Sequence, residues 1–207
     1  MTTGYSDRIN HAFAFAAKHH DTQVRKGTAL PYLTRPANVA VILTRYGQSE
    51  DTVLAAILHG VIEGSVRDGF TREELDEWIG NKFGRPVLET ALAVAERRTD
   101  DEGVELSPDE RKRDAVARLA SASTPARWVC AADALHSIGT VLADLKRTEY
   151  PETVWSRTSR GREGTIRYYR SLCDRLAEVG FDAPILEELR RAVEAVEQQH
   201  GAIAVKG

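Results

Sequence analysis

Apolar residues recur at spacings of three and four along nearly the whole chain, and strict alternation of apolar and polar residues is almost absent. The first spacing places apolar side chains on one face of a helix, whereas alternation is typical of a strand. The pattern predicts an all-α fold, with helices over about residues 13–18, 36–46, 49–62, 71–83, 86–95, 126–145, 166–179 and 184–200 and one more that begins near 107.

Residues that start helices support these bounds. Thr71 followed by Glu74 is a capping-box pattern, and Ser107 followed by Pro108 and Glu110 has the composition of a helix start. The helix predicted over 49–62 ends in LAAILHGVI, which is apolar nearly all round and predicts a position in the centre of a helical bundle. The polar stretch 97–108 is predicted to be a surface loop.

The composition is that of a globular protein. The chain has 207 residues, of which 42% are hydrophobic and 29% charged, so it can bury a core of its own. No stretch separates two domains, and we expect one domain over 1–200 followed by a tail over 201–207. The net charge of −3 gives no global reason to bind nucleic acid or an anionic membrane. No secretory signal or membrane span is evident, which predicts a cytoplasmic protein; the oligomeric state stays open.

Three clusters contain residues that can bind anions, coordinate metals or transfer protons. Arg25 and Lys26 lie between two predicted helices, where a guanidinium and an ammonium suit a phosphate group, although a solvated basic turn would have the same sequence. His59 and Glu63 are one helical turn apart in the most apolar helix and could share a metal or a proton, or His59 could be a buried structural residue.

The third cluster lies in the predicted helix 126–145. Asp133 stands in the apolar stretch AADALHSI, with His136 three residues later. A single aspartate there could be a structural hydrogen-bonding residue. Three clusters of this kind, each next to or within apolar helices, favour a shared central site, because ionisable groups in apolar surroundings are costly without a partner or a purpose.

The order and spacing of these clusters resemble the HD-domain superfamily, and within it the hydrolases that remove pyrophosphate from the 3′ position of (p)ppGpp. The matching segments are HDTQVRKGTALPYLTRP at 20–36, HGVIEGS at 59–65, AADALHS at 131–137 and the basic stretch VWSRTSRGREGTIRYYRSL at 154–172. The resemblance extends from about residue 11 to residue 189 and implies a single HD-type helical bundle.

The resemblance also implies site residues. The family holds Mn²⁺ with four side chains, and His59 and Asp133 match two of these positions, whereas Arg35 and Gly60 stand at the other two. Glu63 matches the first member of the catalytic Glu-Asp pair that follows in the family, and Gly64 stands at the second. The catalytic candidates of this chain are Glu63 and His59. The positions that the resemblance assigns to nucleotide binding are occupied by Arg25, Lys26, Arg35, Ser137 and Tyr168.

Neither Gly60 nor Arg35 can act as a metal ligand. Glycine brings no ligand atom, and arginine keeps its proton at accessible pH, so Arg35 adds a positive charge where a ligand is needed. We therefore expect no cofactor, with Mn²⁺ bound only if the family site survives. The guanidinium of Arg35 is expected near the metal position, paired with Asp133 or Glu63.

Four functions follow from these residues. The leading interpretation is an HD-domain protein that has lost Mn²⁺-dependent hydrolysis and keeps a pocket for a phosphorylated small molecule, with a guanine nucleotide as one candidate. The second is an active phosphohydrolase with a rearranged metal site formed by His59, Glu63, Asp133 and His136. The third is metal-free acid–base chemistry with Glu63 or His59 as proton carrier. The fourth is a structural or partner-binding helical domain.

Overall fold

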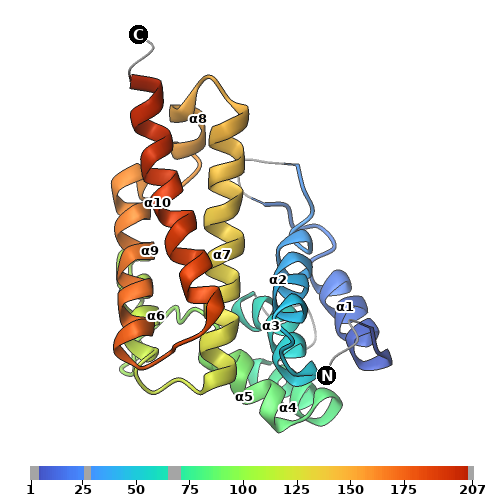
Figure 1. Cartoon of the computed structure of the whole chain (residues 1–207). Helices are drawn as coiled ribbons and strands as arrows, with labels where there is room; N and C mark the ends of the chain where they lie inside the picture. Colours follow the sequence, from blue (N-terminus) through green and yellow to red (C-terminus); the bar gives the residue numbers. More distant parts are fainter. Residues whose placement is uncertain (1–4, 26–28, 65–70, 205–207) are drawn as a thin grey trace.

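The helices follow one another along nearly the whole length of the chain (Figure 1). The computed structural model describes residues 5–25, 29–64 and 71–204, and within these ranges it contains no β-strand, only two isolated bridges. The all-α prediction is confirmed. None of the helices in these ranges is long and apolar enough to cross a bilayer. The helices are α1 (Asp7–His19), α2 (Thr34–Arg45), α3 (Glu50–Glu63), α4 (Arg72–Phe83), α5 (Arg85–Val94), α6 (Pro108–Arg118), α7 (Thr124–Arg147), α8 (Pro151–Trp155), α9 (Gly161–Glu178) and α10 (Pro184–Ala204).

The predicted helix starts are present. The Thr71 side chain accepts a hydrogen bond from the backbone N–H of Glu74, and the Glu74 carboxylate accepts one from the backbone N–H of Thr71, which completes a capping box on α4. Ser107 and Glu110 form the same motif on α6. These bonds satisfy backbone N–H groups that have no partner within the first turn of a helix.

The largest differences from the sequence prediction are at α1, α8, α9 and α10. α1 begins at Asp7, six residues before the predicted start. The five-residue helix α8 was not predicted; Pro151 lies in its first turn, where a fixed backbone angle and a missing N–H are tolerated. α9 begins at Gly161, inside the basic segment that was expected to precede it, because a first turn at the surface needs no apolar residues. α10 continues to Ala204, four residues into the stretch that was expected to be a tail.

The centre of the bundle is α3. All residues from Thr52 to Ile62 are buried, as its uniform apolarity predicts, and the helix packs against α1, α2, α5 and α7. Burying one large aliphatic side chain contributes about 1.5–3 kcal/mol, so α3 supplies much of the hydrophobic stabilisation. Because His59 and Glu63 lie in its last turns, this packing fixes their positions.

The long helix α7 joins two sides of the molecule. It packs against α2, α3 and α5 on one side and against α10 on another, and Figure 1 shows it between these groups. Beyond it, α9 packs against both α10 and α6. Side chains of α7 therefore face α2 and α3 in one direction and α9 in another, and the candidate site lies where these helices meet.

Candidate functional site

A cavity of about 490 Å³ is lined by residues of α2, α3, α5, α6, α7, α8 and α9, of the segments before α2 and α9, and of the segment after α5. We refer to it as the central cavity. Of the eight site residues selected from the sequence, seven line it, and Lys26 lies outside the described residues. The seven are Arg25, Arg35, His59, Glu63, Asp133, Ser137 and Tyr168.

Arg35, in the first turn of α2, and Asp133, in the middle of α7, form a two-pronged ion pair. Nε of Arg35 donates to Oδ1 of Asp133 at 2.7 Å, and Nη2 donates to Oδ2 at 2.5 Å. Both side chains are largely buried, with 30% and 19% of their surface exposed. Burial alone would raise the pKa of Asp133, but the charge and hydrogen bonds of Arg35 outweigh it and hold this pKa well below its usual range. Both oxygens of Asp133 are therefore engaged by a cation.

The space beside Gly60 is filled by side chains from the segment before α2. A Cβ atom at position 60 would lie 3.2 Å from the hydroxyl oxygen of Tyr32 and 3.6 Å from Nε2 of His20, and the rings of Tyr32 and His20 lie 4.5 Å apart between centroids. At Gly64, a Cβ atom would lie 3.0 Å from Nε2 of His19. Two glycines one turn apart therefore let these rings pack closely against α3.

His59 and Glu63 both line the cavity, as their four-residue spacing predicts. Nδ1 of His59 lies 2.8 Å from the carbonyl oxygen of Ala56. Because a carbonyl only accepts, Nδ1 carries the proton, which leaves Nε2 of a neutral ring as the nitrogen that can accept a hydrogen bond. Oε1 of Glu63 accepts from the backbone N–H of Glu96 at 3.0 Å, so this carboxylate ties the end of α3 to the segment after α5.

His136 does not join this group. It is absent from the cavity lining, and its Nε2 is buried without a hydrogen-bond partner among the described residues. Burial lowers the pKa of His136. The negative charge of Asp133 opposes this shift, and the positive charges of Arg25 and Arg35 add to it. In the described ranges, no three or more His, Cys, Asp or Glu side chains cluster closely enough to hold a metal ion, so the set His59, Glu63, Asp133 and His136 does not converge.

The α9 side of the cavity is an aromatic wall with cations over it. The guanidinium carbon of Arg160 lies 5.3 Å from the centroid of the Tyr168 ring, and Nζ of Lys112 lies 5.6 Å from it. Tyr168 also meets the ring of Tyr169 edge to face at 5.0 Å between centroids. Burial raises the pKa of Tyr169 to about 12, and a hydrogen bond with Ser137 opposes this shift. Both phenols therefore stay neutral near pH 7.

Backbone hydrogen bonds between residues 23–25 and residues 30–32 hold Arg25 at the cavity. The backbone N–H of Arg25 donates to the carbonyl of Leu30 at 2.9 Å, and that of Tyr32 donates to the carbonyl of Gln23 at 2.9 Å. Val24 and Pro31 form an isolated bridge between the same two segments. These contacts therefore position Arg25 at the cavity and the Tyr32 ring beside Gly60.

Several lining residues were not identified from the sequence. Arg157, Arg160 and Tyr169 lie within the basic stretch that was matched only as a whole. Tyr32, which packs beside Gly60 but does not line the cavity, lies within a motif that was quoted for other residues. Lys112 lies in a helix rich in charged residues, where nothing in the sequence distinguishes a cavity-facing lysine from a solvated one. Tyr32 could have been found by asking which large side chain fills the space left by Gly60.

Comparison with known proteins connects this site to a family. A family model described as HD domain matches residues 12–153, more than half of the chain. Guanosine-3′,5′-bis(diphosphate) 3′-pyrophosphohydrolase of Aquifex aeolicus is 35% identical over 83 residues, which are 40% of this chain and 11% of that protein. A probable GTP pyrophosphokinase of Mycobacterium leprae is 37% identical over 79 residues, 38% of this chain and 10% of that protein. The chain thus matches about a tenth of the length of these curated relatives.

Solved structures show the same fold over more of the chain. A metazoan ortholog of SpoT, described as hydrolysing ppGpp, superimposes with a TM-score of 0.67 at 23% identity, over 97% of this chain and 99% of that one. The protein lmo0812 of Listeria monocytogenes EGD-e superimposes with a TM-score of 0.63 at 25% identity, over 77% of this chain and 96% of that one. These likenesses concern the arrangement of the helices.

Proposed function

The chain belongs to the HD domain family, and we propose that it binds a phosphorylated nucleotide in the central cavity without hydrolysing it by the family's Mn²⁺ route. The relatives named as acting on guanosine bis(diphosphate) and GTP make a guanine nucleotide the first ligand to test. The observation that carries the proposal is the ion pair between Arg35 and Asp133.

This pair leaves little room for a metal ion. A divalent cation needs several oxygen or nitrogen ligands, and the two oxygens of Asp133 already accept from Arg35. Gly60 adds no donor, and the Tyr32 ring lies where a side chain at this position would extend. A guanidinium about 4 Å from a cation costs about 4 kcal/mol per unit of metal charge at an effective dielectric of 20. The residues present therefore do not fit the manganese site that the family implies.

The rest of the cavity suits an anionic nucleotide. Its volume of about 490 Å³ falls within the range of small-molecule sites, roughly 300–1,000 Å³. Basic side chains from four segments of the chain line the cavity. The planar guanidinium group of arginine matches the paired oxygens of a phosphate. Tyr168 offers an aromatic surface on which a base can stack. The basic lining residues are Arg25, Arg35, Lys112, Arg157 and Arg160.

In this arrangement His59 and Glu63 have binding and structural tasks. The proton on Nδ1 of His59 is held by the Ala56 carbonyl, so Nε2 can accept a hydrogen bond from a ligand hydroxyl. Glu63 faces the same cavity, and its Oε1 is held by the Glu96 backbone. A carboxylate at this place disfavours a phosphate next to it and favours a sugar hydroxyl that donates a hydrogen bond.

Two measurements test the proposal separately. Calorimetric titration with ppGpp and with GDP should give saturable binding in the presence of a chelator, weaker by about tenfold in Arg25→Ala, which removes one charge-assisted contact. The matched control is Arg190→Ala, because Arg190 lies on α10 and does not line the cavity. Absence of saturable binding to either nucleotide would refute the binding claim.

Pyrophosphate release from ppGpp should stay at the background rate with Mn²⁺ and with a chelator. Release that requires Mn²⁺ and disappears in Asp133→Asn would refute the claim that the metal route is lost. Binding and turnover are separate readouts, so either half of the proposal can fail without the other.

A further inference from the structure

A second set of basic side chains lies in a groove between α6 and α9, next to the central cavity. The groove has a volume of about 710 Å³, and its lining includes five basic residues and one acidic residue, Asp109. We refer to it as the α6–α9 groove. The basic residues are Lys112, Arg113, Arg160, Arg167 and Arg175. A local excess of this size contrasts with the net charge of −3 of the whole chain.

The basic residues of the groove differ in how far their charge is already compensated. Three have an acidic partner: Arg160 with Asp109, Arg175 with Glu178, and Lys112 with Glu96. Arg113 lies 4.0 Å from Glu110, at the limit of an ion pair. Arg167 is exposed and has no ion pair or side-chain hydrogen bond within the described part of the chain. Arg167 is therefore available to an external anion, and Arg113 is the most weakly paired of the other four.

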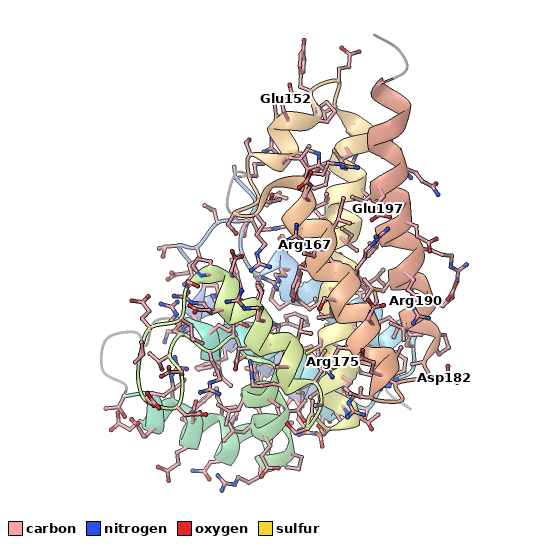
Figure 2. The ribbon with its side chains drawn as sticks, turned by 90° about the vertical axis from the view of Figure 1, so that its left-hand side faces the viewer. Glu152, Arg167, Arg175, Asp182, Arg190 and Glu197 are labelled. Carbon is pink, nitrogen blue, oxygen red and sulfur yellow. The ribbon has the colours of Figure 1, made fainter. Side chains whose placement is uncertain are left out.

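The donors follow the axis of α9. Arg167, Ser171 and Arg175 are four residues apart, so they lie on one face over two turns, and eight residues of helix span about 12 Å. Figure 2 shows Arg167 and Arg175 along α9, and Arg190 on α10. Only one nitrogen of Arg175 is used by Glu178, at 3.0 Å, so its guanidinium keeps further donors. A row of this length exceeds the reach of one phosphate group.

We propose that the α6–α9 groove is a second binding site, separate from the central cavity, for a small molecule that carries a chain of condensed phosphates. Arginine forks and serine hydroxyls along one helix face match successive phosphate oxygens. The volume is that of a small-molecule site. The acidic balance of the chain as a whole disfavours a long nucleic acid, which would have to lie over the negative surface as well.

The groove and the central cavity meet at shared residues. Lys112, Arg160 and Tyr168 line both, so a ligand in the groove would alter the cations that lie over the Tyr168 ring. The proposal does not rest on the function proposed for the central cavity, because Arg113, Arg167 and Arg175 line the groove and not the cavity.

Titration calorimetry with inorganic tripolyphosphate tests the site. Charge reversal in Arg167→Glu should raise the dissociation constant at least roughly tenfold, and added salt should weaken binding to the native protein, since the contacts are ionic and exposed. Arg190→Glu is the matched control, because Arg190 is also exposed, lies on α10 and does not line the groove. Equal binding by Arg167→Glu and Arg190→Glu would overturn the proposal.

A further pair of measurements separates the groove from its alternatives. Arg25→Ala should keep the Arg167-dependent binding of tripolyphosphate, whereas loss of that binding would assign the phosphate to the central cavity and refute a second site. A single-stranded oligonucleotide that binds more tightly than tripolyphosphate, and loses this in Arg167→Glu, would show a nucleic-acid surface instead. Because Arg167 is exposed and unpaired in the described structure, Arg167→Glu should keep the native helix content and melting temperature.

Discussion

Arg35 and Arg167 show two uses of the same side chain in one protein. Arg35 is largely buried and gives two of its donors to Asp133, at 2.7 and 2.5 Å. Arg167 lies exposed on α9 and has no ion-pair partner in the described ranges. The first arginine holds α2 to α7 where the resemblance implies a metal ligand, and the second leaves its charge for a ligand. Burial and the nearest carboxylate decide between these uses, and neither can be read from the residue type.

The largest effect on stability is expected when the buried Arg35–Asp133 pair is broken. Asp133→Ala leaves the Arg35 guanidinium without its partner in a mostly closed space, and removing one member of a buried ion pair costs about 3–5 kcal/mol. Because 19% of the Asp133 side chain is exposed, we expect the lower end, about 3 kcal/mol of the free energy of unfolding. Urea denaturation measures it. Asp174→Ala, an exposed aspartate of α9, is the control and should change stability by less than about 0.5 kcal/mol.

The same pair has a pH signature. The folded-state pKa of Asp133 lies below its unfolded value of about 3.9, so the unfolded chain takes up the proton first. The stabilisation is therefore present above about pH 4 and is lost as the pH falls towards the folded pKa. Urea midpoints between about pH 6 and pH 3 should fall less steeply in Asp133→Asn than in the native protein. Equal slopes would mean that the Arg35–Asp133 pair does not persist in solution.

A smaller effect is expected at Gly60, which stands where the resemblance implies a metal ligand. Gly139 of α7 has nothing within 4 Å of a built Cβ, so Gly139→Ala should stabilise the helix by about 0.5–1 kcal/mol. At Gly60 the new methyl group would lie 3.2 Å from the Tyr32 hydroxyl, and crowding of a packed site costs about 1–3 kcal/mol. Gly60→Ala should therefore be less stable than Gly139→Ala by about 2 kcal/mol.

The origin of that difference can be isolated. In a Tyr32→Ala background the space beside Gly60 is open, so adding Gly60→Ala should cost little or increase stability slightly. Thermal unfolding of the two single variants and the double variant gives the interaction between the sites. Additive effects would show that Tyr32 does not occupy the place that a side chain at position 60 would need.

The fold could be predicted because it depends on repeated signals. The apolar spacing predicted most of the helices, and capping residues such as Thr71 and Ser107 predicted where α4 and α6 begin. The short helix α8 could not be predicted, since five residues carry less than two turns of periodic pattern. The family was also accessible from sequence, because several motifs occur in one order over most of the chain.

Site residues could be predicted from the sequence only where the interacting residues lie in the same motif. The spacing of His59 and Glu63 placed both on one face of α3, and both line the central cavity. Arg35 and Asp133 are 98 residues apart, so the choice between Asp133 and Glu63 as the partner of Arg35 needed the packing of α2 against α7. His136 looked similar to these residues in sequence, but it does not line the cavity. The roles assigned to the lining residues in binding remain predictions.

The smallest effect is expected at the boundary between the central cavity and the α6–α9 groove. At Gly164, a Cβ atom would lie 2.8 Å from Cβ of Arg160, closer than two such atoms approach, so Gly164→Ala has to move the Arg160 backbone or the start of α9. Arg160 would then lose its position over Tyr168, now 5.3 Å from the ring centroid, and its bond to the Pro108 carbonyl at 2.8 Å. A cation–π contact contributes about 0.5–1 kcal/mol, which corresponds to a two- to fivefold weaker affinity for nucleotide and for tripolyphosphate. Calorimetry on Gly164→Ala, Arg160→Ala and the double variant measures this.

If Gly164 acts by leaving room for Arg160, the double variant binds no more weakly than Arg160→Ala alone. A further loss would mean that Gly164 contributes to binding independently of Arg160.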